Sequence, residues 1–473
     1  MEFTNAHARH DLTYSDVFLV PSRSGVKSRF DVNLSTPDNT GMTIPLVSAN
    51  MNSVTGPRLA AALARRGGLG VLPQDLSLDD TLQAVAWVKA QSPLWDTPFV
   101  LDEDATVADA RELVPPIAGV TIQSRAGLLD AAALEHASAD ATIAELTGAA
   151  SFTLDASNID RGRGAFDALY AAGVTSAPVV ADGRIVGALS RKSALRNTVF
   201  EPAVDAQGRL RVAVAIGVNA DVATRARALV DAGVDVLVMD TAHGHQEAMV
   251  RALETVAALD LGVPIVAGNI VTSDAARDLV AAGANILKVG VGPGAMCTTR
   301  MMTAVGRPQF SAVLDAAETA RELGAHVWAD GGVRYPRDVA LALAAGSSAV
   351  MIGSWFAGTV EAPGVVRRDA AGALYKESWG MASTKAVRAR FAALDPFERE
   401  RKELYAEGIS SSSIYLDPLR PTLDDLLDMI TAGVRSSFTY AGAQTVTEFH
   451  ARARVGIQSA AGYEEGKALP VSW

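Results

Sequence analysis

The chain has 473 residues, of which 49% are hydrophobic and 20% are charged, so it is long enough for one large domain and one smaller domain. Its net charge of -11 argues against a nucleic-acid surface, because duplex binding relies on a basic face. The N-terminus lacks the apolar core of a signal peptide, no apolar run is long enough to span a membrane, and one cysteine cannot form an intramolecular disulfide. We therefore expect a cytoplasmic protein that contacts neither membrane nor nucleic acid and holds no structural metal.

Short apolar runs ending in Gly, Asn, Asp or Ser recur along the chain, and each is followed by a stretch of helical character. Eight of them are present: 45–49, 69–72, 212–218, 235–239, 264–268, 286–290, 327–331 and 349–353. From the third onward they start roughly 20 to 40 residues apart, which is the length of one strand, one helix and two loops. This pattern predicts an α/β protein with a closed parallel (β/α)8 TIM barrel.

The gap between the second and third runs spans more than a hundred residues and predicts a second domain inserted into the first. Within it, residues 165–196 have the pattern of an α-β-β-α unit with a hairpin turn at Asp182-Gly183, and residues 99–126 repeat it more weakly. We expect a degenerate tandem repeat. The predicted division is barrel at 1–94, inserted domain at 95–200 and barrel again at 201–473.

After the eighth run, a polar and weakly periodic segment extends from about 367 to 421. Such a stretch is either an active-site flap or a disordered tail. It follows a barrel strand on the catalytic face, and helical sequence resumes after it, so we favour a flap.

The sixth run leads into a glycine-rich loop, GVGPGAMCTTR, that carries the single cysteine, Cys297. Loops after barrel strands build the active site, and glycines let backbone N–H groups or carbonyls approach a ligand closely. Nearby N–H dipoles or Arg300 would favour the thiolate and make Cys297 a nucleophile. The alternative is a buried structural thiol, the common fate of a lone cysteine.

Four further strand ends carry polar residues or glycines. Asp330-Gly331-Gly332 and Gly353-Ser354 follow the seventh and eighth runs, where barrels often bind phosphate, although paired glycines also serve simple tight turns. The fourth run ends in DTAHGH, from Asp240 to His245, whose spacing is unlike that of a zinc site. Asn269 follows the fifth run, and the residues around it leave its role open.

Several motifs resemble the IMP dehydrogenase and GMP reductase family over nearly the full chain: KVGVGPGAMCTTR, ADGGVR, MIGSWFAG, LTYSDVFLVPS and VSANMNSV. The first of these is highly specific at this barrel position. The insertion, from about residue 95 to 197, resembles the tandem CBS module that many IMP dehydrogenases carry at the same point. Such modules typically bind adenine or guanine nucleotides, so the resemblance implies a nucleotide effector.

The resemblance implies roles for individual residues. Cys297 would attack C2 of the purine, and the carbonyls of Gly292, Gly294 and Cys297 would hold a monovalent cation such as K+. Substrate contacts are implied for Met51, Asp330 (ribose), Gly332, Gly353 and Ser354 (phosphate), Gly380 and Met381. We assign cofactor contacts to Asp240, Thr241, Asn269, Arg300, Thr439 and Tyr440. One departure matters: Ala295 stands where the family usually has Ser, so a hydroxyl normally offered to the phosphate is missing.

The two activities of the family share one covalent adduct and differ in how it is resolved. Dehydrogenases hydrolyse it with an Arg-Tyr pair on the flap, whereas reductases release ammonia with help from a Thr and a Glu, here Thr299 and Glu407. Both enzymes have the Thr and Glu, but no Arg-Tyr dipeptide occurs between 367 and 421, where it is expected near Leu394-Asp395. Three segments, LYKESWGMAS, TAVGRPQFSAV and GVRSSFTYAGA, also look like reductase sequence.

These features favour an NADPH-dependent GMP reductase that converts GMP to IMP and ammonia. An IMP dehydrogenase is the first alternative, supported by the CBS-like insertion, which the best-known reductases lack. A catalytically silent nucleotide sensor is the second. The family assembles as tetramers that can pair into octamers, and a homotetramer is the default expectation.

Overall fold

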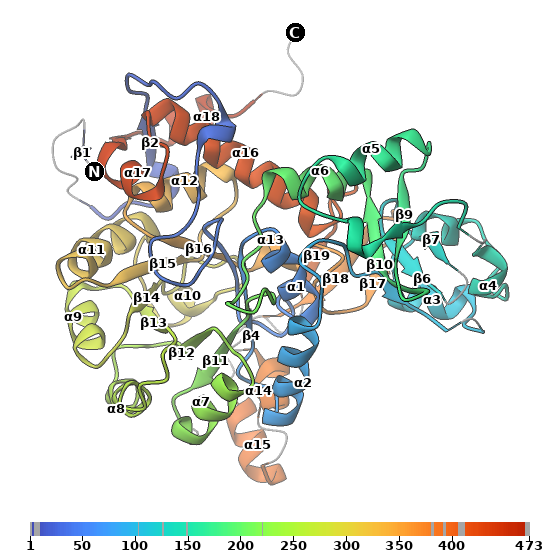
Figure 1. Cartoon of the computed structure of the whole chain (residues 1–473). Coiled ribbons are helices and arrows are strands. Elements are labelled where there is room, and N and C mark those ends of the chain that lie inside the picture. The colour runs from blue at the N-terminus through green and yellow to red at the C-terminus, as the bar shows by residue number, and fades with distance from the viewer. Residues whose placement is uncertain are drawn as a thin grey trace.

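The computed structural model describes residues 2–3, 10–102, 104–124, 127–147, 150–219, 221–379, 383–390, 394–404 and 412–468. Eight parallel strands close into a barrel in the order β11-β12-β13-β14-β15-β16-β3-β4 (Figure 1). They are β3 (Leu46–Ser48), β4 (Leu69–Leu72), β11 (Ala213–Gly217), β12 (Val236–Asp240), β13 (Ile265–Ile270), β14 (Ile286–Val289), β15 (His326–Asp330) and β16 (Ala349–Ile352). The TIM barrel predicted from the eight apolar runs is confirmed.

A ring of helices covers the barrel and buries the outer faces of its strands. These helices are α1 (Pro57–Arg65), α2 (Leu78–Lys89), α7 (Val222–Asp231), α8 (Glu247–Ala257), α9 (Ser273–Ala281), α11 (Gln309–Glu322), α12 (Pro336–Ala344) and α16 (Leu423–Ala441). Helix α16 packs against both α12 and α1 and so completes the ring. It begins at the N-cap Thr422, whose side chain accepts from the N–H of Asp425, and ends at Gly442 in the left-handed conformation.

The insertion between α2 and β11 folds into two three-stranded sheets outside the barrel (Figure 1, right). The first contains β5 (Phe99–Val100), β6 (Thr121–Gln123) and β7 (Leu128–Asp130), with α3 (Val107–Leu113) and α4 (Ile143–Leu146); the second contains β8 (Leu154–Asp155), β9 (Ser176–Ala181) and β10 (Arg184–Ser190), with α5 (Gly164–Ala171) and α6 (Arg191–Val199). In each sheet the central strand pairs in parallel with one neighbour and antiparallel with the other. The chain therefore repeats one topology, with shorter strands in the first half.

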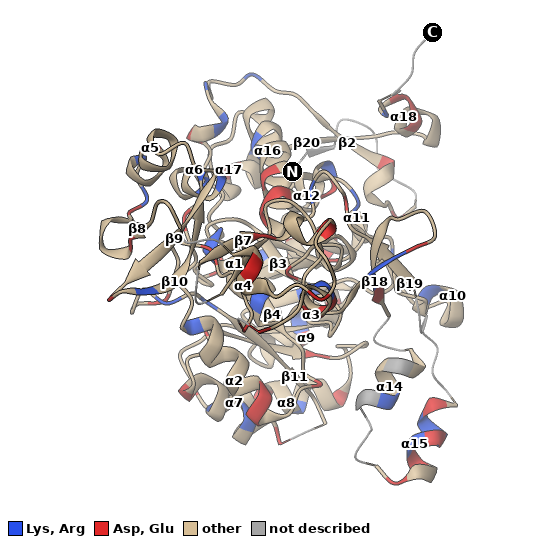
Figure 2. Cartoon of the chain, turned by 90° about the vertical axis from the view of Figure 1, so that its right-hand side faces the viewer, with Lys and Arg blue, Asp and Glu red and all other residues tan. Residues whose placement is uncertain are grey.

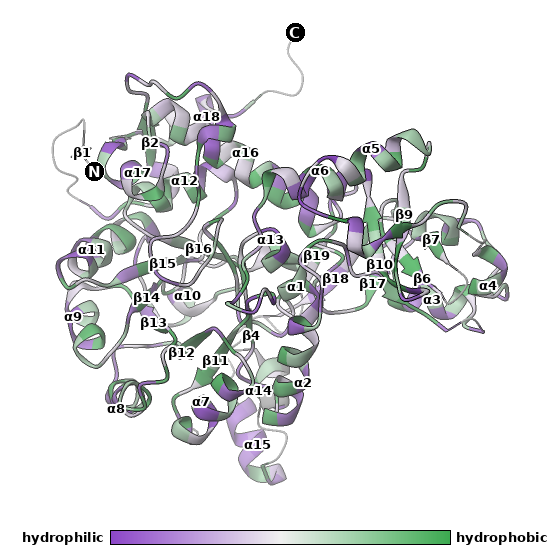
Figure 3. Cartoon of the chain, in the orientation of Figure 1, coloured by the Kyte–Doolittle hydropathy of each residue, from purple (hydrophilic) through white to green (hydrophobic). Residues whose placement is uncertain are grey.

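The segment after β16 forms a small antiparallel sheet that the sequence pattern did not predict. Its strands are β17 (Val366–Arg368), β18 (Leu374–Ser378) and β19 (Ser412–Tyr415), and α14 (Thr384–Arg390) and α15 (Pro396–Glu403) lie between the last two. Figure 2 shows α14 and α15 projecting from the barrel, and Figure 3 shows α15 as largely hydrophilic beside the apolar barrel strands. Below, the sheet β17-β18-β19 is called the flap sheet.

The flap sheet shares a hydrophobic core with the first half of the insertion. Buried Val360 and Leu416 belong to one cluster with Val107 and Ile122, and Arg368 forms an ion pair with Glu135 at 2.6 Å. Because protein cores are closely packed, a displacement of one side chain in a shared core is transmitted to its neighbours. The insertion is therefore in direct contact with the base of the segment that approaches the barrel mouth.

The remaining elements form one more small sheet and several short helices. This fourth three-stranded sheet contains β1 (Glu2–Phe3), β20 (Arg454–Ile457) and β2 (Val17–Val20). The short helices are α10 (Thr299–Thr303), α13 (Ser354–Ala357), α17 (Val446–Arg452) and α18 (Ala460–Glu465), with 3-10 turns at Tyr14–Asp16, Arg29–Asp31, Ala131–Glu135 and Ala156–Asn158. Among the described residues, no helix is both long and apolar enough to cross a membrane.

Candidate active site

A cavity of about 1230 Å³ lies at the carboxyl ends of the barrel strands. Most of the residues predicted from the sequence line it: Met51, Asp240, Thr241, Asn269, Gly292, Gly294, Cys297, Thr299, Arg300, Asp330, Gly332, Gly353 and Ser354. Gly380, Met381 and Glu407 lie outside the described residues. The cavity is larger than most single-ligand pockets and has room for a nucleotide and a second molecule.

The loop after β14 presents Cys297 to this cavity. Gly290 and Gly292 have φ of 151° and 84°, and a Cβ on Gly292 would lie 2.5 Å from Cδ of Arg300, so this turn requires glycine. The N–H of Cys297 donates to the carbonyl of Gly294 at 3.0 Å, and the thiol is exposed. The alternative of a buried structural thiol is therefore wrong.

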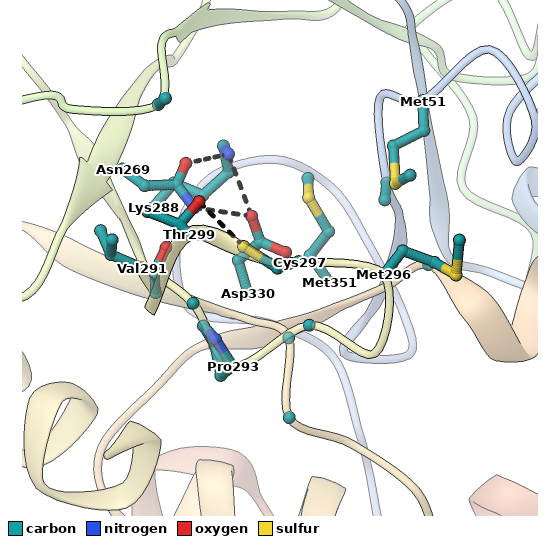
Figure 4. A pocket seen from close by; sticks show the side chains of 18 of the residues that line it. Met51, Asn269, Lys288, Val291, Pro293, Met296, Cys297, Thr299, Asp330 and Met351 are labelled. Atoms are coloured by element: carbon teal, nitrogen blue, oxygen red, sulfur yellow. Dashed lines mark hydrogen bonds and ion pairs between the residues drawn. The ribbon is translucent and has the colours of Figure 1, made fainter. Parts of the chain in front are cut away.

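Thr299 lies beside the thiol at the first position of α10. Its Oγ1 is 3.3 Å from Sγ of Cys297, as Figure 4 shows. A hydroxyl at this distance can pass a proton to or from a group that the sulfur attacks. The arrangement provides a nucleophile and an adjacent proton carrier on one short segment.

The loops after β15 and β16 meet the cysteine loop at the barrel mouth. Gly331 and Gly332 have φ of 91° and 81°, and a Cβ on Gly331 would lie 3.2 Å from the nitrogen of Gly294. Gly353 is close to Met51, since a Cβ there would lie 3.6 Å from the methionine Sδ. A side chain at Gly331 would crowd the approach of this loop to the cysteine loop, and glycine at 331, 332 and 353 leaves backbone rather than side chains to meet a ligand here.

Lys288 on β14 is a site residue that the sequence reasoning missed. It is 2% exposed, and its Nζ lies 2.9 Å from Asp240 and 3.0 Å from Asp330 and also donates to Asn269 (Figure 4). Burial alone would lower the pKa of Lys288, but the two carboxylates raise it above its usual value, so the side chain is an ammonium. The sequence did contain a signal for Lys288, since it is a charged residue within an otherwise apolar strand that is buried throughout.

The two histidines near the end of β12 are not part of the cavity lining. His245 forms a 2.7 Å contact with Asp278 on α9, and both side chains are substantially exposed. Across the described ranges of the chain, no group of three or more His, Cys, Asp or Glu side chains could hold a metal ion. The polar residues of this motif that line the cavity are Asp240 and Thr241.

Thr439 and Tyr440, predicted to contact the cofactor, do not line the cavity of their own chain. They lie in the last turn of α16, where the carbonyl of Tyr440 accepts from the N–H of Ser22 at 2.9 Å and its ring is 67% exposed. A contact of these residues with a bound cofactor within one chain is therefore not supported.

The segment after β16 reaches the cavity at two points. Val387 on α14 is among the lining residues, and Oγ of Ser412 on β19 lies 3.3 Å from Sδ of Met296 in the cysteine loop. Residues from the predicted flap therefore contact the loop that carries the nucleophile.

Comparisons with known proteins agree with this geometry. The family described as "IMP dehydrogenase / GMP reductase domain" matches residues 11–468. GMP reductase from Mycobacterium tuberculosis (strain ATCC 25618 / H37Rv) is 53% identical over 480 residues and covers 100% of both chains. Inosine-5'-monophosphate dehydrogenase from Halalkalibacterium halodurans is 36% identical, covering 94% of this chain and 92% of its own.

A solved structure is also similar over nearly the whole chain. It is a cysteine-to-alanine variant of GMP reductase from Trypanosoma brucei in complex with guanosine 5'-monophosphate, with a TM-score of 0.70, 31% identity and 99% of each chain covered. The prediction of an oxidoreductase enzyme is confirmed by these full-length matches. The chain belongs to the IMP dehydrogenase / GMP reductase family.

Proposed function

We propose that this enzyme, a GMP reductase by its 53% identity to full-length GMP reductases, converts GMP and NADPH to IMP, ammonia and NADP through a covalent adduct on Cys297. The observation that carries the mechanism is the 3.3 Å contact between the exposed Cys297 thiol and Thr299 Oγ1 at the cavity wall. A free thiol with an adjacent hydroxyl is suited to attack on an electron-poor carbon that bears a leaving amine.

The proposed reaction leads from GMP to IMP in four steps. The Cys297 thiolate adds to C2 of GMP, Thr299 relays a proton to the amine, and ammonia leaves to give a thioimidate. When bound, NADPH supplies the hydride that C2 of the thioimidate accepts. Expulsion of the Cys297 thiolate then yields IMP. Glu407, which lies outside the described residues, is proposed as the partner of Thr299 in the proton relay.

The flap sequence favours the reductase over the dehydrogenase. No Arg-Tyr dipeptide occurs between 367 and 421, so the group that would activate water on the adduct is missing. Near the expected position, Asp395 instead caps α15, with its carboxylate accepting from the N–H groups of Phe397 at 3.1 Å and Glu398 at 3.2 Å. Asp395 therefore stabilises the start of α15 and does not activate water. Without a group that activates water, the covalent adduct on Cys297 is resolved by hydride addition in this proposal.

The cavity residues fit a nucleotide and a nicotinamide cofactor side by side. Asp330 would accept hydrogen bonds from the ribose hydroxyls of GMP, and Gly332, Gly353 and Ser354 would bind its phosphate through backbone N–H groups. Asp240, Thr241, Asn269 and Arg300 would hold the cofactor. The carbonyls of Gly292, Gly294 and Cys297 belong to one turn and would hold a monovalent cation, which would stabilise the loop.

We also propose a regulatory insertion and an oligomer. The two halves of the insertion repeat one strand topology, which supports a tandem CBS module that binds an adenine or guanine nucleotide. Tyr440 is 67% exposed and neither Thr439 nor Tyr440 lines its own cavity, so we assign their cofactor contact to a neighbouring copy in a homotetramer. Both assignments are independent of the chemistry at Cys297.

The covalent mechanism is tested by comparing the wild-type enzyme with Cys297→Ala. The wild type should consume reduced cofactor and release one ammonia for each GMP, and the variant should bind GMP without turnover. Turnover retained in Cys297→Ala would remove the covalent step. Cofactor consumption without ammonia release would contradict the reductase assignment.

A further inference from the structure

The Lys288 cluster, defined as Lys288, Asp240 and Asp330, is the most deeply buried set of charges in the cavity wall. Two carboxylates lie at the ends of β12 and β15, and the lysine on β14 lies between them. Because each carboxylate is within 3.0 Å of the same nitrogen, their facing oxygens are no more than about 6 Å apart. Without the ammonium, two negative charges would face each other and repel.

Neutral amides complete the cluster and fix its geometry. Asn269 donates to Asp330 at 2.9 Å, and Asn50 and Gln74 donate to Asp240 at 3.0 and 3.3 Å. Each carboxylate therefore has one hydrogen-bond donor that is charged and at least one that is neutral. The charged groups that face Lys288 are the two aspartates, so its removal would leave a net charge of two negatives in a buried wall.

Backbone packing prevents the lysine from moving away. A Cβ on Gly268 of β13 would lie 2.7 Å from the Cβ of Lys288, so only glycine leaves room for the lysine on the neighbouring strand. The side chain is almost without exposed surface. The neighbouring barrel strands therefore fix the position of the Lys288 side chain. In this position its ammonium pairs with both Asp240 and Asp330.

We propose that Lys288 is a positioning residue that offsets the repulsion between Asp240 and Asp330 and so keeps Asp330 oriented to accept the 2′- and 3′-hydroxyls of the substrate ribose, while linking this contact to Asp240 on the cofactor side. This role rests on the proposed function, because it takes Asp330 as the ribose-binding group. An ionised carboxylate held in place is a stronger acceptor than a protonated or rotated one. Selectivity for ribonucleotides over deoxyribonucleotides then depends on a lysine that itself need not contact the ribose.

The test compares binding of GMP and 2′-deoxy-GMP by isothermal titration calorimetry, in the wild type, Lys288→Met and Lys288→Met/Asp240→Asn. The wild type should bind GMP about 10-fold or more tightly than the deoxynucleotide, as expected for a hydrogen bond to a charged group. Lys288→Met should lose most of this preference, because the two facing carboxylates then repel each other and turn Asp330 away from the ribose. The double variant carries the same net charge in the cluster as the wild type, so the preference should return.

The matched control is Asp240→Asn alone, which keeps the contact between Lys288 and Asp330 and should keep the ribose preference. If Lys288→Met does not fold, Lys288→Gln, which also removes the positive charge, replaces it and should lose the preference in the same way. A ribose preference that persists in Lys288→Met, or that fails to return in the double variant, would overturn the proposal. A wild type that prefers GMP over 2′-deoxy-GMP but does not consume NADPH would contradict the proposed function and leave Lys288 testable by the same titrations.

Discussion

Replacing Thr299 by Val removes the hydroxyl beside Cys297 and keeps the size of the side chain. The contact of 3.3 Å to sulfur is a weak hydrogen bond, worth about 1 kcal/mol or less in the resting enzyme. The thiol is exposed, so no buried group loses its only partner. Stability and GMP affinity should therefore change little.

The rate should change far more, because the hydroxyl is proposed to act when the amine departs. Loss of a positioned proton carrier lowers rates by about 100- to 10,000-fold, equivalent to about 3–5 kcal/mol of barrier. We expect kcat for GMP and NADPH to fall by this factor with KM nearly unchanged, measured from the absorbance of the reduced cofactor. Thr303→Val is the matched control, since its hydroxyl lies on the same helix, donates to the carbonyl of Thr299 and lies outside the cavity.

A second assay separates the proton relay from hydride transfer. IMP with NADP should form the same covalent adduct and reduced cofactor without any movement of ammonia. Thr299→Val should keep the rate of this half-reaction and lose only the ammonia-dependent half. Equal losses in both halves, or an unchanged kcat, would refute the reasoning.

Three further predictions concern stability and binding. Arg66→Met should lower the free energy of unfolding by about 3–5 kcal/mol in urea titrations, since Arg66 is 1% exposed and pairs with Asp424 at 2.7 Å. Burial raises the pKa of Asp424, but Arg66 and Arg196 together hold it below its usual range, so the loss of stability in the variant should persist down to about pH 4 and narrow only below it. Ala295→Ser should lower the KM for GMP by about 2- to 10-fold, because a neutral hydrogen bond contributes about 0.5–1.5 kcal/mol, and an unchanged KM would show that the hydroxyl does not reach the phosphate. Leu416→Ala should cost about 2–5 kcal/mol and raise hydrogen exchange in β18 and α3 together, whereas a change confined to β18 would contradict the shared core.

The barrel was predictable because parallel strands buried on both faces are continuous apolar runs with clear ends. The run at 286–290 and strand Ile286–Val289 differ by one residue, and the insertion point follows from the gap between two such runs. The flap sheet escaped prediction because its strands are short and largely polar, as in LYKES and SSIY. Its buried face is covered by Val107 and Ile122, which are more than two hundred residues away in the chain.

In the site, too, contacts between residues close in sequence could be predicted, and contacts between distant residues could not. Cys297 and Thr299 are close in sequence and form a specific motif, so their pairing could be predicted. The role of Lys288 could not be predicted from the sequence, because its two ion-pair partners, Asp240 and Asp330, lie on other strands that come next to it only in the closed barrel. Tyr440 is the opposite case, because it belongs to a segment that resembles the family but does not line the cavity of its own chain.

The most direct test of the central claim is to give the purified enzyme two substrate pairs in parallel, GMP with NADPH and IMP with NAD, and to follow the reduced cofactor. We expect steady consumption of NADPH in the first reaction, with one ammonia released for each GMP. In the second we expect no sustained formation of NADH, because the flap lacks the Arg-Tyr pair that would hydrolyse the adduct. Sustained NADH formation from IMP, with no NADPH consumption in the presence of GMP, would contradict the account and identify a dehydrogenase.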